Sequence, residues 1–351
     1  MLSFESDYIQ GCHERILQAL VASNYEREPG YGADSYSRRA AEKIRRACEC
    51  PKAEVFFIAG GTQTNQLVIS TLLDSHEGVL AAATGHIACH EAGAIEYSGH
   101  KVLELPQKEG KISARDLSAW LTEFSMDQNR DHLVFPGMVY LSQPTEYGTL
   151  YSLEELMDIR NICDAFGLRL YIDGARLGYG LASACNDVSL PDLARLCDAF
   201  YIGGTKVGAL CGEALVFPFG APKQFLTKVK QRGAMLAKGR LIGVQFDTLF
   251  TDDLYLKISQ HAMAMAEKLR DVFVEAGFTL HMPLVSNQIF IVLTMDQRNV
   301  LSTHLRFSFW ERLDSECCVI RLAASWATTE QEVEELRAVL KEFKKEMEML
   351  K

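Results

Sequence analysis

The stretch AFYIGGTKVGAL, residues 199–210, places Lys206 in a glycine-rich turn directly after a short apolar strand. A lysine is costly to bury, so the end of an interior strand is an unusual place for one. A surface lysine in a loop is the simplest interpretation. The functional interpretation is a lysine whose surroundings lower its pKa, which suits covalent bonding to an aldehyde.

The segments around this turn define the fold class. From about residue 53 to about residue 218, apolar strand-like runs alternate with amphipathic helical runs, which predicts an α/β fold with a mostly parallel sheet covered on both faces. Seven strands are expected in the runs AEVFFIAGG (53–61), GVLAAAT (78–84), KVLELP (101–106), LVFPGMVYLSQ (133–143), LRLYIDGA (168–175), AFYIGGTK (199–206) and GEALVFP (212–218).

Helix signals lie between these strands, and the pattern changes toward the C-terminus. Helices are expected in 62–75, 86–99, 113–124 and 152–167, with Ser113 and Ser152 as N-caps and Gly167 at a helix end. Beyond about residue 240, a long helical run leads to short strands and a charged terminal helix. We therefore expect a large domain over residues 1–245 and a small α+β domain over residues 246–351.

Composition narrows the function classes. The 351 residues carry a net charge of −10, which disfavours nucleic-acid binding. The N-terminus lacks the basic start and apolar core of a signal peptide, and no apolar run approaches the ~20 residues of a membrane span. Ten scattered cysteines without zinc-site spacing indicate free thiols in a reducing cytoplasm.

In an open α/β sheet, ligands bind beyond the carboxyl ends of the strands, so ligand-binding side chains are expected among the residues that follow each strand. Gly60, Gly61 and Thr62 follow the first strand and open a helix, an arrangement that favours phosphate. The turn matches neither the Walker A loop nor GxGxxG. A plain strand-to-helix turn is the alternative.

Asp173 and Lys206 follow two other predicted strands. An internal ion pair with Arg176 is the structural alternative for Asp173. Together with the phosphate turn, however, an aspartate and then a lysine about 30 residues later are what pyridoxal phosphate requires. The lysine bonds to the aldehyde, and the aspartate keeps the pyridine nitrogen protonated, so that the ring accepts electrons.

His86 opens the segment GHIACHEAGA (85–94), and His90 follows four residues later on the same helical face. His86 is placed to stack on the cofactor ring or to act as a base. For His90, a polar helix turn is an equally good interpretation. We predict no metal site, because the pair lacks a carboxylate pattern such as HExxH.

These motifs, taken together, resemble the threonine aldolases, which are pyridoxal phosphate enzymes of the aspartate aminotransferase fold (fold type I). The resemblance runs nearly end to end and is carried by GGTQTNQL (60–67), GHIACHEAGA, YIDGARLG (171–178), GGTKVGALCG (203–212), RGAMLAKGR (232–240) and VIRLAAS (319–325). It implies that Lys206 bonds covalently to the cofactor and that Asp173 pairs with the pyridine nitrogen. It also implies that His86 stacks on the ring and helps to deprotonate the substrate hydroxyl.

The other residues that the resemblance implies bind the cofactor or the substrate. The cofactor is expected to contact Gly61, Thr62, Arg176 and Arg240, with Arg240 reaching the phosphate from a neighbouring subunit. The substrate is expected to contact Ser6, Tyr31, Arg176 and Arg321, where the arginines bind its carboxylate. Tyr31 is expected to enter the neighbour's site, because family members are homodimers or homotetramers with shared sites.

The implied reaction is retro-aldol cleavage of L-threonine, L-allo-threonine or a related β-hydroxy-α-amino acid to glycine and an aldehyde. The family commonly carries Glu-Asn-Thr-His-Asn where this chain has SQPTE (142–146), so Thr145 stands in the place of a second histidine. This departure keeps a β-eliminating lyase of the tryptophanase or cysteine-lyase type open, with Lys206 as its base. An aminotransferase and a non-catalytic binding protein on this fold are disfavoured.

Overall fold

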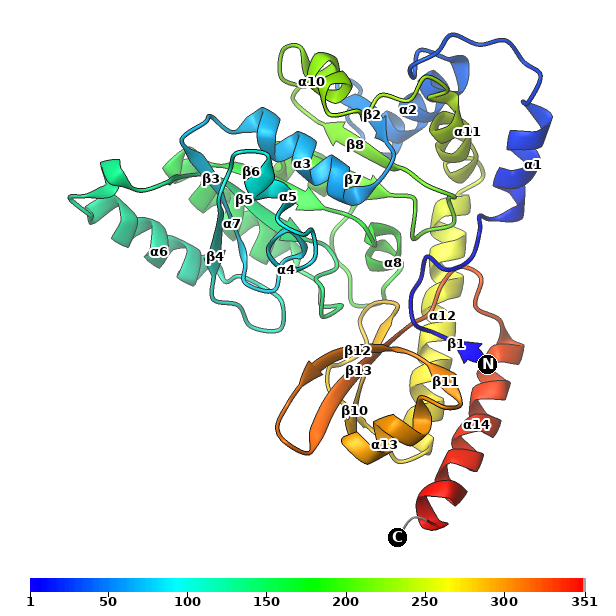
Figure 1. The fold of residues 1–351 in the computed structure, drawn as a ribbon. Helices are drawn as coiled ribbons and strands as arrows, with labels where there is room; N and C mark the ends of the chain where they lie inside the picture. The colour runs from blue at the N-terminus through cyan, green and yellow to red at the C-terminus, as the bar shows by residue number, and fades with distance from the viewer. Residues whose placement is uncertain (350–351) are drawn as a thin grey trace.

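A twisted seven-stranded sheet forms the centre of the larger domain in this computed structural model, which describes residues 1–349 (Figure 1). Its strand order is β2-β8-β7-β6-β5-β3-β4, and β8 alone runs antiparallel to its two neighbours. The predicted seven-stranded, mostly parallel sheet is therefore confirmed. The strands are β2 (Glu54–Ile58), β3 (Glu77–Ala82), β4 (Val102–Leu105), β5 (Phe135–Ser142), β6 (Arg169–Asp173), β7 (Ala199–Gly203) and β8 (Glu213–Phe217).

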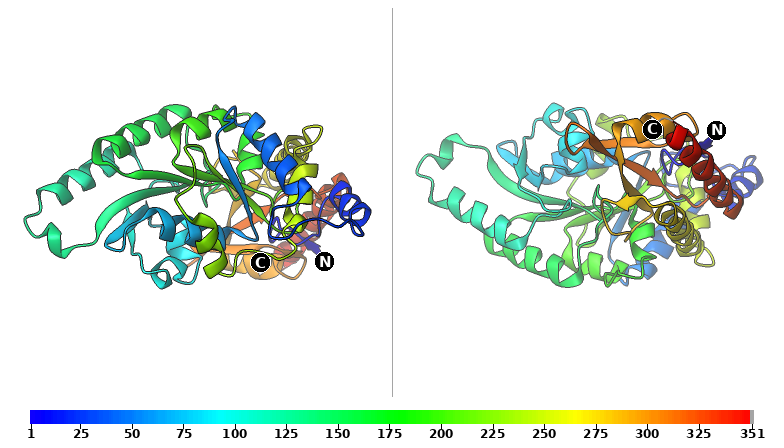
Figure 2. Two further views of the ribbon diagram at one scale, coloured as in Figure 1. Left: turned by 90° about the horizontal axis from the view of Figure 1, so that it is seen from above. Right: turned by 90° about the horizontal axis from the view of Figure 1, so that it is seen from below.

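Helices cover both faces of this sheet, as the views along the sheet show (Figure 2). Alternate residues of one strand point to opposite faces: Leu170 and Ile172 enter one apolar core, and Tyr171 enters the other. The helices before the small domain are α1 (Glu14–Ala22), α2 (Ser35–Ala47), α3 (Gly61–Leu72), α4 (His86–Cys89), α5 (Ala94–Tyr97), α6 (Ala114–Met126), α7 (Leu153–Phe166), α8 (Leu177–Leu181), α9 (Leu190–Leu196), α10 (Phe225–Gln231) and α11 (Arg240–Leu249), with a 3-10 turn η1 (Arg130–His132).

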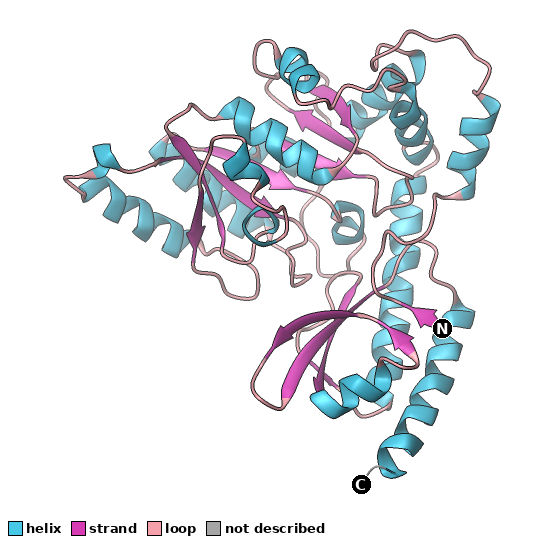
Figure 3. Ribbon diagram, in the orientation of Figure 1, coloured by secondary structure: helices cyan, strands magenta, loops and turns pink. Residues whose placement is uncertain are grey.

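The small domain packs an antiparallel sheet against helices (Figure 3). The long helix α12 (Leu254–Glu275) runs from the large domain into the small one, where α14 (Glu330–Met349) packs against it. The sheet has the order β12-β13-β10-β9, and its members are β9 (Thr279–Leu280), β10 (Gln288–Thr294), β12 (Ser308–Arg312) and β13 (Cys317–Ala323), with α13 (Met295–Leu301) alongside. The N-terminal strand β1 (Leu2–Ser3) pairs with β11 (Leu305–Arg306), so the chain start joins this domain.

The predicted capping residues of α6 and α7 are confirmed. Ser152 caps α7 in a capping box with Glu155, Ser113 caps α6, and Gly167 ends α7 with a φ of 70°. All ten cysteines are free thiols. Among residues 1–349, no helix is long and apolar enough to cross a membrane.

The single helix predicted over 86–99 is wrong. The segment forms two four-residue helices, α4 and α5, separated by Ala92 and Gly93 with φ values of 52° and 70°. A left-handed backbone cannot continue a right-handed helix. The first helix ends at Cys89, and Glu91 in the irregular stretch that follows contacts His86.

Candidate active site

The carboxyl ends of the central strands meet the start of α3 around a cavity of about 320 Å³. Ser142 at the end of β5 lies in register with Asp173 at the end of β6, and Lys206 follows β7 in the next turn. The cavity is lined by Tyr8, Ala59, Gly60, Gly61, Thr62, His86, Ser142, Pro144, Thr145, Glu146, Asp173, Ala175, Arg176, Tyr201, Thr205, Lys206 and Glu213. Six of the residues predicted for the site thus share one cavity.

Asp173 is a buried carboxylate, and each of its two oxygens accepts two hydrogen bonds. Its Oδ2 accepts hydrogen bonds from the hydroxyl of Tyr140 (2.6 Å) and from the amide of Asn65 (3.0 Å). Its Oδ1 accepts from the hydroxyl of Tyr201 and from the backbone N–H of Ala175. Burial by itself raises the pKa of Asp173, but the charge of His86 and these hydrogen bonds outweigh burial and lower it. These contacts therefore favour the ionised form of Asp173.

Lys206 is the neighbouring basic group. Burial and then the like charge of Arg176 lower the pKa of Lys206 to about 8. Its ammonium group lies 5.8 Å from the ring centre of Tyr8. A lysine with this pKa supplies the neutral, nucleophilic amine far more readily than an ordinary surface lysine.

His86 is oriented by a carboxylate that the sequence did not assign. Its Nδ1 lies 2.8 Å from Oε1 of Glu91, and the amide of Asn65 donates to the same oxygen at 2.7 Å. The ligand atoms of His86, Glu91 and Asp173 lie within 4.8 Å of one another, a spacing that a metal ion also fits. We interpret the cluster as a hydrogen-bonded network, because Asn65 bridges the two carboxylates directly.

Two arginines lie beside the cavity with different partners. Arg176 forms a buried bidentate ion pair with Asp7, so Asp7 occupies its Nε and one terminal nitrogen. Arg321, on β13, bonds only neutral groups within the described chain, including the hydroxyl of Ser308 at 3.1 Å. Burial and then the like charge of Arg176 lower the pKa of Arg321 to about 10. Arg321 is thus a half-buried cation that forms no ion pair among residues 1–349.

Glu5 connects this arginine to the N-terminal segment, and Ser6 is the next residue. The backbone oxygen of Glu5 accepts from Arg321, and the adjacent hydroxyl of Ser6 is buried without a hydrogen-bond partner in residues 1–349. A buried hydroxyl without a partner is costly, so a polar ligand at this point would satisfy it.

The start of α3 forms the other wall. Gly60 caps the helix without a side-chain bond, so the first N–H groups of α3 are available for an anion. A Cβ on Gly61 would lie 3.0 Å from the hydroxyl of Tyr201, so glycine allows the close approach. Glu213, at the start of β8, accepts from the N–H of Gly204 and the hydroxyl of Thr205. Burial raises the pKa of Glu213 to about 7, which lessens its charge repulsion toward an anion in the cavity.

Tyr31 and Arg240 lie outside the cavity of their own chain. Tyr31 is 53% exposed, and its N–H donates to Ala237, three residues before Arg240. Arg240 starts α11 and donates to the backbone oxygens of Glu26 and Asn24. The segments that carry Tyr31 and Arg240 therefore contact each other, and neither residue lines the cavity that contains Lys206.

Several residues of the site had no assigned role in the sequence analysis. Asn65 and Glu91 stand inside quoted motifs, so their motif positions were the available signal. Tyr140 and Tyr201 are polar residues within apolar strand runs, which is a weaker signal. Glu146 and Glu213 also stand inside quoted segments, but neither they nor Asp7 were given a role, because their contacts depend on the folded chain.

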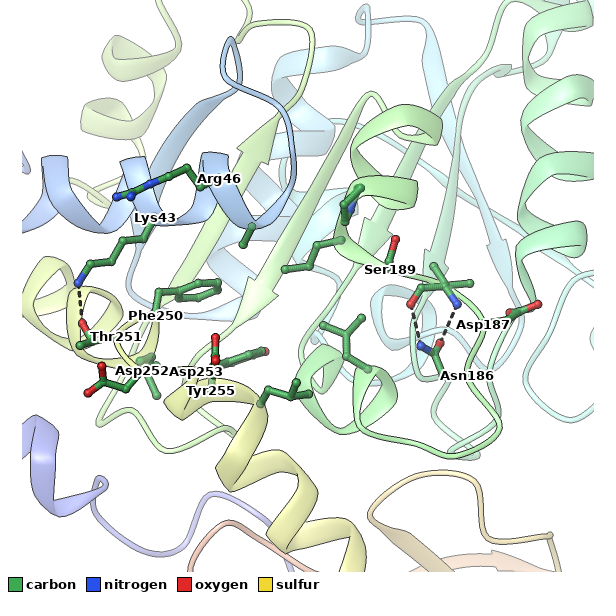
Figure 4. Close-up of a pocket in the computed structure, with 17 residues that line it drawn as sticks. Lys43, Arg46, Asn186, Asp187, Ser189, Phe250, Thr251, Asp252, Asp253 and Tyr255 are labelled. Carbon is green, nitrogen blue, oxygen red and sulfur yellow. Dashed lines mark hydrogen bonds between the residues drawn. The ribbon is translucent and has the colours of Figure 1, made fainter.

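A larger groove of about 910 Å³ lies elsewhere, between α2, the α11–α12 corner and the loop before α9 (Figure 4). Its floor includes Phe250 and Tyr255, and Lys43 at its edge is already bonded to Thr251. Within residues 1–349, this groove lacks the combination of a buried aspartate, a lysine of lowered pKa and an uncapped helix start that the smaller cavity holds. The chemistry therefore identifies the smaller cavity as the candidate active site.

Comparison with known proteins agrees with this geometry. The chain belongs to the beta-eliminating lyase family, whose model matches residues 3–306. Over 341 residues it is 30% identical to the low specificity L-threonine aldolase of a Pseudomonas species, covering 95% of this chain and 96% of the relative. The threonine aldolase structure from Leishmania major is 41% identical with a TM-score of 0.93, covering 97% and 99% of the two chains. The aspartate aminotransferase of Thermus thermophilus is 13% identical with a TM-score of 0.71, covering 98% and 91%, which shows fold type I.

Proposed function

We propose that this protein is a pyridoxal phosphate-dependent aldolase that cleaves L-threonine, L-allo-threonine or a related β-hydroxy-α-amino acid to glycine and an aldehyde. One arrangement carries the proposal: Asp173 and Lys206 share a cavity at the ends of β6 and β7, and the half-buried Arg321 nearby forms no ion pair within residues 1–349. The threonine aldolase names of the relatives support the choice of reaction. The reaction places the protein in threonine breakdown and glycine formation.

The residues of the cavity fit the proposed cofactor. Lys206 would hold it by a covalent bond from Nζ, and Asp173 would keep a proton on the pyridine nitrogen. The free N–H groups at Gly61 and Thr62 would bind the phosphate. The ring of His86 would stack on the cofactor, in the orientation that Glu91 fixes. When bound, the cofactor supplies an electron sink for the pair released at Cα.

The substrate carboxylate is the counter-ion that Arg321 requires. A guanidinium binds a carboxylate through two parallel hydrogen bonds, which fixes orientation as well as position. Ser6 directly follows Glu5, whose backbone oxygen accepts from Arg321, and the unpartnered hydroxyl of Ser6 would add a third bond. We assign Arg176 a supporting part, because Asp7 already takes two of its donors.

Two fixed points decide which bond of Cα breaks. The carboxylate is held at Arg321 and the amino nitrogen at the cofactor, so rotation about the substrate backbone is restricted. A group must then accept the proton of the β-hydroxyl. The resemblance assigns this proton to His86, and Glu146 is a second acceptor that lines the cavity.

We further propose that two copies of the chain share their active sites, as a homodimer or homotetramer in the cytoplasm. Tyr31 and Arg240 lie together outside their own cavity, and Tyr31 is exposed. In a dimer, both would reach the cavity of the partner, where Arg240 would bind the phosphate and Tyr31 the substrate.

Incubation of the holoenzyme with L-threonine and with L-allo-threonine tests the proposal. We expect acetaldehyde and glycine from at least one of them, and an absorbance band of the bound cofactor that Lys206→Ala abolishes. Ammonia and a keto acid without aldehyde would show β-elimination. A wild-type protein without the cofactor band would overturn the whole proposal.

A further inference from the structure

Glu146 lies in the wall of the cavity, directly after Thr145 and four residues beyond the end of β5. Its side chain is buried, with 9% of the residue exposed. Oε1 accepts hydrogen bonds from the hydroxyl of Ser142 (2.6 Å) and from the backbone N–H of His86 (2.9 Å). Oε2 makes no hydrogen bond with residues 1–349. The carboxyl group is therefore held firmly by one oxygen, and the other oxygen remains available.

The neighbouring Thr145 offers no such group. Its hydroxyl lies 2.6 Å from the hydroxyl of Thr149, and its backbone N–H donates to the backbone oxygen of the same residue. These contacts hold Thr145 within the loop that follows β5. A threonine hydroxyl is also a very weak base, so Thr145 cannot accept a proton from another alcohol.

Most other ionisable groups of the cavity are already occupied. Both oxygens of Asp173 accept hydrogen bonds, and so do both oxygens of Glu213. Lys206 is the proposed covalent anchor. The candidates that remain for proton transfer at the substrate hydroxyl are His86 and Glu146.

Between these two, the contacts favour Glu146. Nδ1 of His86 is bonded to Glu91, an arrangement that fixes the ring for stacking. The ionised carboxylate of Glu146 only accepts, and its fixed Oε1 leaves Oε2 with a defined direction. Burial raises the pKa of Glu146, which brings its proton affinity closer to that of an effective base near neutral pH.

We propose that Glu146 accepts the proton of the substrate β-hydroxyl as the Cα–Cβ bond breaks; this inference rests on the proposed aldol cleavage. The proton moves to Oε2, and the O–H electron pair becomes the second carbon–oxygen bond of the aldehyde. The electron pair of the Cα–Cβ bond stays with Cα. A proton then returns to Cα, and the product is glycine.

Glu146→Gln tests the assignment, because the amide keeps the contacts of Oε1 and removes the base. We expect cleavage of threonine to fall by about 10²- to 10⁴-fold in kcat, with KM and the cofactor band little changed. A second reaction separates the steps: exchange of the α-hydrogen of glycine with deuterated solvent, followed by NMR, requires no β-hydroxyl. This exchange is expected to continue in Glu146→Gln.

Three further variants complete the experiment. Glu154→Gln changes an exposed glutamate on α7 and serves as the matched control. His86→Phe keeps a flat ring, so we expect it to lose less cleavage than Glu146→Gln. Glu146→Asp retains a carboxyl group and is expected to recover part of the rate, which guards against a variant that merely folds poorly.

The inference is overturned if Glu146→Gln cleaves threonine at the wild-type rate, or if it loses glycine exchange together with cleavage while the cofactor stays bound. It is also overturned if His86→Phe abolishes cleavage and Glu146→Gln does not. Failure of the proposed function looks different, because the wild-type protein itself would then release no aldehyde.

Discussion

Asp7 and Arg176 form a buried ion pair beside the active-site cavity, with Oδ2 of Asp7 2.7 Å from Nε of Arg176 and Oδ1 3.0 Å from a terminal nitrogen. Asp7 is 0% exposed and also accepts from the amide of Asn287 in the small domain. The charges of Arg176 and Lys206 overcome the effect of burial and lower the pKa of Asp7. One aspartate thus ties the N-terminal segment to both domains.

Asp7→Asn is therefore expected to destabilise the protein markedly. Loss of one partner leaves the guanidinium of Arg176 as an uncompensated buried charge, which costs about 3–5 kcal/mol. The free energy of unfolding from urea denaturation measures the loss. Asp252→Asn removes the exposed pair with Arg15 and is expected to change stability little. Equal stability of the two variants would contradict the importance of the buried pair.

The lowered pKa of Lys206 predicts how cofactor binding depends on pH. Only the neutral amine attacks an aldehyde, so the rate of association with the apoenzyme should rise with a midpoint near pH 8. Arg176→Gln removes the like charge and leaves Asp7 unpaired, and both changes raise the pKa of Lys206. The midpoint should then move to higher pH in stopped-flow absorbance. A midpoint near the ordinary lysine value in the wild type would contradict this prediction.

Tyr201→Phe tests the network that keeps Asp173 ionised. The variant removes one hydrogen bond to the carboxylate, so the pKa of Asp173 rises. Asp173 then becomes protonated at higher pH, and the acidic limb of kcat/KM shifts upward. Tyr151→Phe also removes a buried phenol, but one that bonds Ile112, and it should leave the limb unchanged. An unshifted limb in Tyr201→Phe would remove Tyr201 from the network.

Subunit mixing tests the placement of Arg240 in a partner's site. Lys206→Ala and Arg240→Gln are each expected to be nearly inactive, but their hybrid dimer contains one site without a defect. An equal mixture should recover up to about a quarter of wild-type activity. A mixture of Lys206→Ala and Asp173→Asn is the control, because those residues share a chain and every site stays defective. No recovery from hybrids that copurify would place Arg240 in its own subunit or outside the site.

Much of the fold could be predicted, because both faces of the sheet are buried and its strands therefore appear as continuous apolar runs. The strand order could not, because it depends on packing between distant segments. The helix predicted over 86–99 failed for a local reason. Its apolar periodicity continues through Ala92 and Gly93, whose left-handed backbone is not visible in the pattern.

In the candidate site, too, some residues could be predicted from the sequence and others could not. Asp173, Lys206 and Gly61 stand at strand ends and could be found from their positions alone. Glu91 contacts His86 although the two stand five positions apart, a spacing that a continuous helix would place on different faces. Asp7 meets Arg176 across 169 positions of the chain, and no local pattern reports such a contact. The sequence therefore locates the centre of the site, whereas its supporting contacts require the folded structure.

The most direct test of the central claim is a product balance from L-threonine with the holoenzyme. Glycine, acetaldehyde, ammonia and 2-oxobutyrate are followed in the same samples by chromatography. Aldol cleavage yields equal amounts of glycine and acetaldehyde, with neither of the other products. Formation of 2-oxobutyrate and ammonia without acetaldehyde would contradict it.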